Sequence, residues 1–576
     1  MKALVTKIVE DALVKAIDAG ELPLSGEDLP AVDLERPRDP AHGDWASAVA
    51  LRSAKDAGMA PRAIADIIVA HLSDHPDIEA VEVAGPGFIN LRLSVSALAR
   101  IVVQARERKA DFGKAAPKDE YIQVEFVSAN PVGPMHVGHG RWAALGDALA
   151  LVLEHAGHRV QREFYLNDEG NQMNIFADSV AERYLELCGE PFDLDAIGYK
   201  GAYIIDIAAQ IREAEGDQWV SVDADERRAY FRQRSYDQVL THVKSVLARF
   251  GVEFDLWFSE HSMHVPDDEG RTEIQKSIDG LKEKGYIYEE DGALWFKSED
   301  FGDDKNRVLL KSDGAATYFA ADIAYHDNKF KRGFDLVINL WGADHHGYIK
   351  RLDAAVAALG YPGQLEILLG QMVALYRDGQ LVRMSKRTGE MVTFEELLDE
   401  VGVDAARYHL VRTSSDQPLS FDINQAKDQS SNNPVFYVQY AHARICSILR
   451  KSVGFEGDDP EHELGEDADD IDALAAIHRT EGMNLSLLSA EAELALMRKI
   501  SEFAEVVERA ARDRAPFRLA HYAEELAALY HQFYQQCQVL SDDQDLTSAR
   551  LALIDATRHT LANALRLIGV SAPTKM

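Results

Sequence analysis

Hydrophobic residues follow two different periods along this chain. In its middle part, short apolar runs at 121–127, 159–165, 335–341 and 365–369 alternate with stretches in which apolar residues recur at helical spacing. Short apolar runs bounded by turn residues indicate buried strands, and their alternation with helices predicts a parallel sheet with helices on both faces. Ligands of such sheets bind at the carboxyl ends of the strands, so the loops after these runs are the first candidates for a site.

The first 20 residues are amphipathic. Their apolar positions recur at helical spacing between charged residues, which predicts a helix and not a signal peptide. A second helical stretch begins at Pro61, and the turn at 85–87 leads into an alternating apolar and polar run at 88–93, which indicates a strand. The N-terminal part is therefore expected to form a small α+β domain.

From Thr393 onward the pattern is almost entirely helical. Thr393 and Glu396 have the spacing of a capping box, Gly402 is expected to end that short helix, and Asp404 is expected to cap the next one. Residues 471–576 are rich in Ala, Leu and Glu at 3.6-residue spacing, which predicts a helix bundle.

The predicted fold class is therefore α/β: a Rossmann-like parallel-sheet catalytic domain, a small N-terminal α+β domain and a C-terminal all-α bundle. The expected boundaries are 1–112, 113–392 and 393–576. The chain has 576 residues, of which 46% are hydrophobic, which is enough to build several large cores. No stretch resembles a membrane span, and the three cysteines lack the paired spacing of a disulfide framework or a zinc site, so a reducing cytoplasm is expected.

The formal net charge of −35 argues against a nucleic-acid partner, because polyphosphates prefer basic surfaces. The acidic residues are unevenly placed, however, and ten of them lie in the segment 455–472, which contains no Lys or Arg. Basic residues cluster at 329–332, 350–351 and 509–518. Local basic patches can bind RNA on an acidic protein, so the charge leaves RNA binding open.

The loop after the first predicted strand contains the sequence NPVGPMHVGH at 130–139. The chain has no GxxxxGK[ST] phosphate loop, which disfavours a P-loop enzyme. A nucleotide can instead bind at a helix N-terminus, where His136 and His139 would donate hydrogen bonds to phosphate and Gly138 would let the backbone approach the adenine. The alternative is a loop with two incidental histidines.

A second segment, RMSKRTG at 383–389, follows the hairpin signal Asp378-Gly379. Lys386 lies there on a glycine-flanked loop, so its ammonium can reach a triphosphate and stabilise the charge of departing pyrophosphate. Met384 and Ser385 would contact the same nucleotide. The alternative is a solvated basic loop without a ligand.

These two segments resemble known signatures. The sequence His136-Val137-Gly138-His139 resembles the HIGH motif of class I aminoacyl-tRNA synthetases, and Arg383-Met384-Ser385-Lys386-Arg387 resembles their KMSKS loop. The resemblance is closest to bacterial arginyl-tRNA synthetases and covers essentially the whole chain. It is also carried by VEFVSAN at 124–130, YLNDEG at 165–170, DAAR at 404–407, which is similar to the DALR signature, and YVQYAH at 437–442. Two departures are Arg383 and Arg387, which replace the first lysine and the last serine of KMSKS.

The resemblance implies that L-arginine is activated with Mg-ATP and transferred to tRNA(Arg). A guanidinium is a planar cation that needs carboxylates placed for paired hydrogen bonds. The family places Asp322 and Tyr318 at the guanidinium, with Glu125 nearby, and Ser128, Asn130 and His139 at the amino and carboxylate ends. Without the family, Tyr318 and Asp322 indicate only an exposed pair on one helix face.

Further site residues follow from the same resemblance. The segment WGADHH at 341–346 follows a strand and is expected to line the crevice, with His345 near arginine; a metal site there is the weaker alternative, so none is predicted. Tyr437 and Tyr440 would stack on anticodon bases, although aromatic residues on a helix usually belong to the core. The segment 42–46, HGDWA, resembles the domain that contacts the tRNA elbow, whereas residues 260–264 have no metal-binding spacing and are expected at the surface.

Two rival functions remain at this stage. One is a class I synthetase for another amino acid, which the Tyr318 and Asp322 pair disfavours. The other is an RNA-binding paralogue without catalysis, which the intact His136, His139 and Lys386 disfavour. A monomer without a membrane partner is expected.

Overall fold

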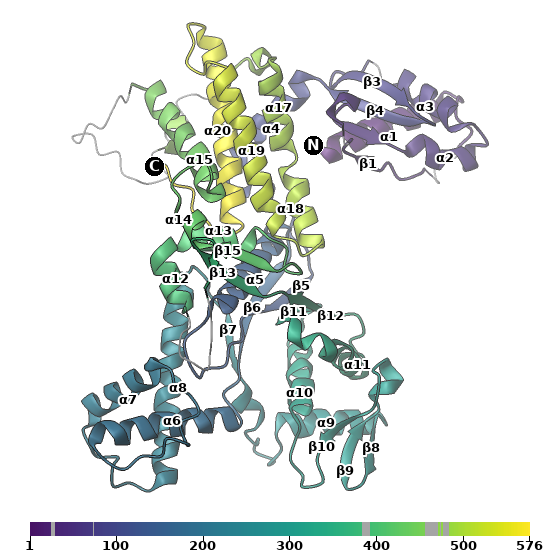
Figure 1. Ribbon diagram of the computed structural model, residues 1–576. Helices are drawn as coiled ribbons and strands as arrows, with labels where there is room; N and C mark the ends of the chain where they lie inside the picture. Colours follow the sequence, from purple (N-terminus) through teal and green to yellow (C-terminus); the bar gives the residue numbers. More distant parts are fainter. Residues whose placement is uncertain are drawn as a thin grey trace.

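The computed structural model describes residues 1–24, 29–37, 39–72, 74–382, 392–454, 471–472, 474–475 and 483–576. Its N-terminal part is a sheet of order β1-β2-β4-β3 with antiparallel neighbours, beside three helices (Figure 1). The elements are α1 (Lys2–Asp18), β1 (Leu34–Glu35), β2 (Trp45–Ser47), α2 (Val49–Ala57), α3 (Pro61–Ala70), β3 (Ile78–Ala84) and β4 (Phe88–Leu93).

The middle of the chain forms a five-stranded sheet of order β12-β11-β5-β6-β7, in which all neighbouring strands are parallel. The chain passes from β5 to β6 on one side and later returns to β11 on the other. The strand order therefore reverses between β5 and β11, and this is the point at which parallel sheets bind ligands. The strands are β5 (Tyr121–Glu125), β6 (Arg159–Leu166), β7 (Leu256–Ser259), β11 (Leu336–Gly342) and β12 (Leu365–Gly370).

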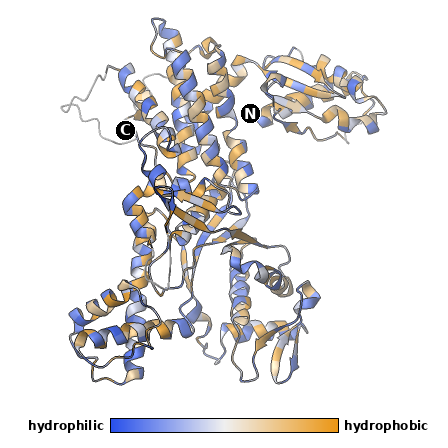
Figure 2. Ribbon diagram, viewed as in Figure 1, coloured by the Kyte–Doolittle hydropathy of each residue, from blue (hydrophilic) through white to orange (hydrophobic). Residues whose placement is uncertain are grey.

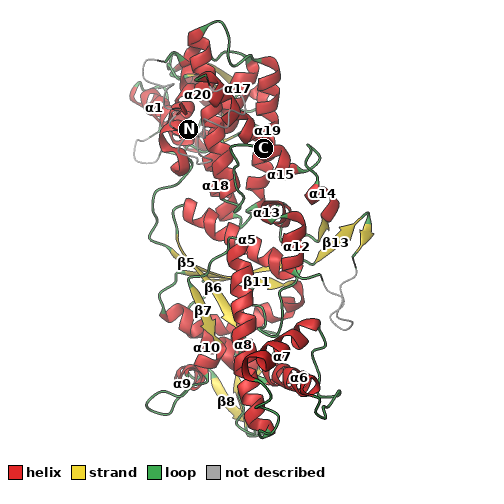
Figure 3. Cartoon of the chain, turned by 90° about the vertical axis from the view of Figure 1, so that its left-hand side faces the viewer, coloured by secondary structure: helices red, strands yellow, loops and turns green. Residues whose placement is uncertain are grey.

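The four strands expected from the apolar runs are all present, and β7 adds a fifth. Two insertions extend from this sheet as separate lobes at the lower left and lower right of Figure 1. The first is helical, with α6 (Asn171–Cys188), α7 (Ala202–Glu215) and α8 (Ala224–Arg249), and Figure 3 shows α8 running alongside the sheet. The second contains α9 (Glu273–Glu283) and the antiparallel strands β8 (Ile287–Glu290), β9 (Ala293–Phe296) and β10 (Arg307–Leu310).

The helices that connect the sheet strands are α5 (Val137–His155), α10 (Tyr318–Lys331) and α11 (Ile349–Leu359). A small sheet of order β14-β13-β15 follows, and the helical part of the chain lies beyond it. These elements are β13 (Val373–Arg377), β14 (Gln380–Leu381), α12 (Phe394–Val401), α13 (Val403–Val411), β15 (Leu419–Asp422), α14 (Ile423–Lys427), α15 (Pro434–Ser452), α17 (Glu491–Ser501), α18 (Phe503–Arg512), α19 (Phe517–Gln536) and α20 (Gln544–Arg566).

The helix bundle includes a helix from the N-terminal part. Helix α4 (Val95–Arg108) packs against α17 and α20, and Figure 1 shows it among them. In Figure 2, hydrophobic and hydrophilic residues alternate along the bundle helices, as amphipathic helices require. None of the described helices is both long enough and apolar enough to cross a bilayer.

The capping box at Thr393 and Glu396 is confirmed, but the expected cap at Asp404 is wrong. Helix α13 begins at Val403 directly after Gly402, so Asp404 lies inside the first turn. Its carboxylate accepts hydrogen bonds from the Ser571 backbone N–H at 3.0 Å and from Gln439 at 2.8 Å. A contact with the end of the chain therefore takes the place of the local cap.

Arg407 of α13 joins three parts of the fold. The fully buried guanidinium pairs with Asp147 of α5 and donates to the carbonyl oxygens of Phe250, at 2.6 Å, and Ile568, at 3.3 Å. Because Arg407→Met leaves buried acceptors and a buried carboxylate without this donor, we expect it to cost about 3 kcal/mol of stability, measured by thermal unfolding.

The matched control is Arg412→Met. Arg412 follows α13 directly, but its side chain is 43% exposed and pairs with Glu524, so its loss should cost less than about 1 kcal/mol. Equal losses of stability in the two variants would contradict a structural role that is specific to Arg407.

Candidate active site

His136 and His139 hold each other at the start of α5. Nδ1 of His136 accepts a hydrogen bond from the backbone N–H of His139 at 3.3 Å, and Nδ1 of His139 accepts from the backbone N–H of His136 at 3.2 Å. The rings stack with their centroids 3.6 Å apart. A backbone N–H can only donate, so both Nδ1 atoms are unprotonated, and each neutral ring carries its hydrogen on Nε2.

This arrangement is a capping box in which histidines replace the usual Ser or Thr and Glu. It places two Nε2–H donors at a helix N-terminus, where the backbone dipole favours an anion. The sequence predicted the two histidines at this turn but not their mutual hydrogen bonds, because the pattern lacks the usual capping residues.

Gly138 and Gly140 are required by their neighbours. A Cβ atom on Gly138 would lie 2.9 Å from Cε1 of His136, and one on Gly140 would lie 2.2 Å from the ring of Phe394. A side chain at either position would displace the His136 ring or move α12 away from α5. Both glycines therefore protect the geometry of the histidine pair.

The chain returns to this pair at the start of α12. Thr393 forms an isolated antiparallel bridge with His136, and the N–H of Phe394 donates to the carbonyl of Met135 at 2.9 Å. Met384, Ser385 and Lys386 precede Thr393 in the sequence and lie outside the described residues. The described chain resumes at residue 392, next to the histidine pair.

The turn after β5 is strained. Val127 and Ser128 have φ angles of 68° and 40°, which non-glycine residues rarely adopt. This turn places the Ser128 hydroxyl where it accepts from the backbone N–H of Tyr165 at 3.2 Å and donates to Oε1 of Glu125 at 3.0 Å. The strained turn therefore holds Ser128 against Glu125, and both residues were predicted to bind arginine.

Asp322 of α10 lies in an acidic pocket. Its carboxylate accepts a hydrogen bond from the Tyr348 hydroxyl. The pKa of Asp322 is raised to about 7, mainly by burial; the charges of Glu260 and Glu125 also raise it, while Tyr348 and Arg351 act in the opposite direction. Two further carboxylates thus lie within electrostatic range of Asp322, and this is an environment that favours a bound cation.

The expectation that Glu260 lies at the surface is wrong. Glu260 is 5% exposed, burial raises its pKa, and the hydroxyl of Tyr165 donates to its carboxylate. It follows β7 directly, and the pairing of β6 with β7 brings it to Tyr165. The contact between Glu260 and Tyr165 was missed because it depends on the pairing of β6 with β7, which the sequence does not reveal. Tyr348 was missed because no motif in its local sequence points to Asp322.

Three other predicted contacts are exposed. Tyr318 begins α10 and is 76% exposed. Asn130 is exposed and donates to Gln172 at 3.0 Å. His345 lies in a 3-10 turn (Ala343–Tyr348) with its side chain 60% exposed. Across the described part of the chain, no group of three or more His, Cys, Asp and Glu is arranged to hold a metal ion.

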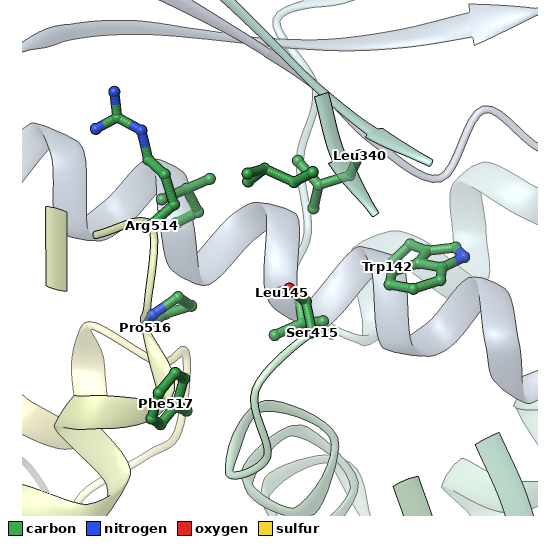
Figure 4. Close-up of a pocket in the computed structure, with 9 residues that line it drawn as sticks. Trp142, Leu145, Leu340, Ser415, Arg514, Pro516 and Phe517 are labelled. Atoms are coloured by element: carbon green, nitrogen blue, oxygen red, sulfur yellow. The ribbon is translucent and has the colours of Figure 1, made fainter. Parts of the chain in front are cut away.

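The opposite side of α5 packs against the helix bundle. Trp142 and Leu145 of α5 line one pocket together with Arg514, Pro516 and Phe517, and Figure 4 shows these side chains. Arg514 forms a bidentate ion pair with Glu366 of β12, with N–O distances of 2.8 and 3.0 Å. The helix that begins with the histidine pair is therefore held directly between the sheet and the bundle.

Tyr437 and Tyr440 lie on α15, on the side that faces α19. Tyr440 is 39% exposed, and its ring stacks at 6.1 Å on His531, which also lies 4.8 Å from the ring of Tyr437. The guanidinium of Arg444 lies 4.0 Å above the ring of Tyr534. These side chains form an aromatic and cationic surface, which is the type of surface that binds unstacked bases.

The comparisons with known proteins agree with this geometry. Three family models match the chain: an arginyl tRNA synthetase N-terminal domain over residues 3–93, the catalytic domain of class I (R) tRNA synthetases over 101–447, and a DALR anticodon-binding domain over 438–576. The chain belongs to the arginyl-tRNA synthetase family. Members of this family use ATP as a substrate, and the parallel sheet and all-helical C-terminal region are those of the class I fold.

Individual relatives extend over the whole chain. An arginine–tRNA ligase of Desulforamulus reducens is 44% identical over 579 aligned residues, which cover 100% of this chain and 99% of that protein. Another, from Heliobacterium modesticaldum, is 46% identical and covers 95% of this chain and 94% of its own length. The fold is also that of a Thermus thermophilus arginyl-tRNA synthetase structure, with a TM-score of 0.72, 24% identity and coverage of 99% and 100%.

Proposed function

We propose that this chain joins L-arginine to the 3′ end of tRNA(Arg), with ATP converted to AMP and pyrophosphate. The observation that carries the proposal is the acidic pocket around Asp322. The charges of Glu260 and Glu125 act on Asp322 there, and a guanidinium is a permanent, planar cation that such carboxylates bind. The N-terminus of α5 suits the phosphates of the second substrate.

In the first step, the arginine carboxylate attacks the α-phosphate of ATP, and the bond to pyrophosphate breaks. Asp322 and Glu125 bind the guanidinium beside Tyr318, while Ser128, Asn130, His139 and His345 contact the rest of the amino acid. The Nε2–H groups of His136 and His139 donate to phosphate oxygens, next to Gly138, and Met384, Ser385 and Lys386 hold the triphosphate. The catalytic contribution is therefore positioning and electrostatic stabilisation, without a general base.

In the second step, the 2′-hydroxyl of the terminal adenosine attacks the carbonyl carbon of arginyl-adenylate, and AMP leaves. Magnesium enters as the complex with ATP, because Mg²⁺ keeps most of its ligands from phosphates and water. We propose no dedicated protein site for the ion.

The domains divide this work. Residues 113–392 would carry the chemistry, residues 1–112 would contact the tRNA elbow, and residues 393–576 would bind the anticodon. The local aromatic and basic surface on α15 and α19 supports this assignment although the chain carries a net charge of −35. We also propose a monomer, which sedimentation analysis would test. The cytoplasm is proposed because Cys188, Cys446 and Cys537 are all free thiols, as in a reducing compartment.

The deciding experiment is charging of total tRNA with labelled arginine. Incorporation that depends on ATP and is specific for arginine would support the proposal. Incorporation of another amino acid in parallel reactions would identify a different class I synthetase. Normal binding of tRNA without any charging would indicate an RNA-binding paralogue that has lost catalysis.

Tyr440→Ala is expected to weaken tRNA binding by about 1–3 kcal/mol, which is the value of stacking one base on an aromatic ring. The measurement is a tRNA titration, with the KM for arginine followed in parallel. The matched control is Phe192→Ala, because Phe192 has similar exposure but lies in the loop between α6 and α7, outside the surface formed by α15 and α19. If the Tyr440 variant bound tRNA as tightly as the wild type, Tyr440 would not contact the anticodon.

A further inference from the structure

A buried chain of hydrogen bonds runs beneath the acidic pocket. Lys329 of α10 is completely buried, and its Nζ donates to Oε2 of Glu125 at 2.6 Å and to Oδ1 of Asn339 at 3.0 Å. Asn339 of β11 is also completely buried, and its Nδ2 lies 2.9 Å from Nε2 of His326. Nδ1 of His326 lies 2.8 Å from the backbone carbonyl oxygen of Asp322. Glu125 and Asp322, two of the three carboxylate residues of the pocket, are thus connected through three buried side chains.

The ammonium group of Lys329 determines which atom donates in each of these hydrogen bonds. An ammonium group only donates, so Oδ1 of Asn339 accepts from Lys329, and the amide of Asn339 donates to Nε2 of His326. Nδ1 of His326 then carries the ring hydrogen, which it donates to the carbonyl of Asp322. The ring is therefore neutral, and burial lowers its pKa to about 3, in agreement with this assignment.

We propose that Lys329 is a positioning residue for arginine binding. This inference rests on the proposed function. Through its direct ion pair, Lys329 holds Oε2 of Glu125 and leaves its Oε1 to Ser128, which is 3.0 Å away. Through Asn339 and His326, it fixes the turn of α10 that carries Asp322. One buried cation thus sets the orientation and the spacing of the carboxylates that receive the guanidinium.

The surroundings of Glu125 explain why the cation is needed. Glu125 is 6% exposed and shares the pocket with Asp322 and Glu260, so its negative charge is opposed by both burial and like charge. Lys329 is the ion-pair partner of Glu125 within the described residues. Its loss would leave a buried carboxylate unpaired, and such a group takes up a proton or turns away from its position.

The test compares Lys329→Gln with Lys331→Gln. Lys331 lies on the same helix, but its side chain is 57% exposed and pairs with Asp327. In arginine charging assays, Lys329→Gln is expected to raise the KM for arginine about tenfold or more, while the KM for ATP changes little. Lys331→Gln is expected to leave both constants unchanged. A merely structural defect would lower the amount of active enzyme and kcat without this selective change in KM.

A second variant covers the case in which Lys329→Gln does not fold. Asn339→Ser keeps the ion pair of Lys329 with Glu125 but removes the hydrogen bond to His326. We expect it to raise the KM for arginine about threefold, because one neutral hydrogen bond to the pocket is lost. Wild-type KM for arginine in folded Lys329→Gln, or in Asn339→Ser, would overturn the inference. Failure of the wild-type protein to charge arginine would instead overturn the proposed function.

Discussion

Asp322→Asn is expected to raise the KM for arginine about 100-fold, while the KM for ATP stays within about twofold. The variant keeps the size of the side chain and its contact with Tyr348 but removes the charge that faces the guanidinium. Truncating one partner of a buried charge pair costs roughly 2–5 kcal/mol, and 100-fold lies within that range. Steady-state charging kinetics with varied arginine and then varied ATP measure both constants.

The pH dependence provides a second measurement on the same variant. Because the pKa of Asp322 is raised to about 7, its carboxyl is protonated below that pH and ionised above it. The guanidinium stays charged throughout, so kcat/KM for arginine is expected to fall as the pH drops below 7 in the wild type. Asp322→Asn should reduce this dependence, and the part that remains would come from Glu260, whose pKa is also raised.

The control for this variant is Asp327→Asn on the same helix. Asp327 bonds to Ser277 and Lys331, and these contacts lie away from the acidic pocket. Its substitution should leave the KM for arginine unchanged. If Asp322→Asn changed the KM for arginine and the KM for ATP equally, Asp322 would not be part of the pocket that binds the arginine side chain.

Lys386→Ala is expected to slow adenylate formation by about 100-fold, which corresponds to the roughly 3 kcal/mol that one preorganised donor contributes to a developing anion. The physical reason is that the ammonium stabilises charge as pyrophosphate leaves, and it does so in the transition state more than in the bound substrates. Single-turnover kinetics with tRNA present measure the chemical step, and arginine binding should remain nearly intact.

Arg387→Ser is the control, because it removes a positive charge from the same loop and introduces the residue that is usual in the family. We expect the rate of its chemical step to stay within about threefold of the wild type. If Lys386→Ala formed the adenylate at the wild-type rate, this lysine would have no role in catalysis.

Local patterns predicted most of the secondary structure that positions the site. The apolar runs gave four strands of the sheet at the right places, and the spacing of Thr393 and Glu396 marked the start of α12. These signals work because both are local: a buried strand is a short run of apolar residues, and a capping box joins two residues three positions apart. Asp404 shows the limit of such rules, since a contact with Ser571 replaced the cap that its local sequence suggested.

The pocket was predictable only in part. Asp322, Glu125 and Ser128 could be named from the family resemblance, but Glu260 could not, because it follows a short strand that carries no motif. Lys329 appeared in the sequence as one member of a basic cluster, with nothing to distinguish it from Lys331 and Arg332. Burial separates them: Lys329 is completely enclosed, whereas the side chain of Lys331 is 57% exposed.

The sequence by itself determined the class of the fold and the family, because short motifs and local periods carry both. It also supplied the residues that we propose for nucleotide and amino acid. Only the tertiary structure decided which carboxylates share the pocket and which cation holds them. Those facts depend on the face that α10 presents to the sheet and on the pairing of β5, β6, β7 and β11. Such contacts join residues far apart in the chain, and no local pattern encodes the distance between them.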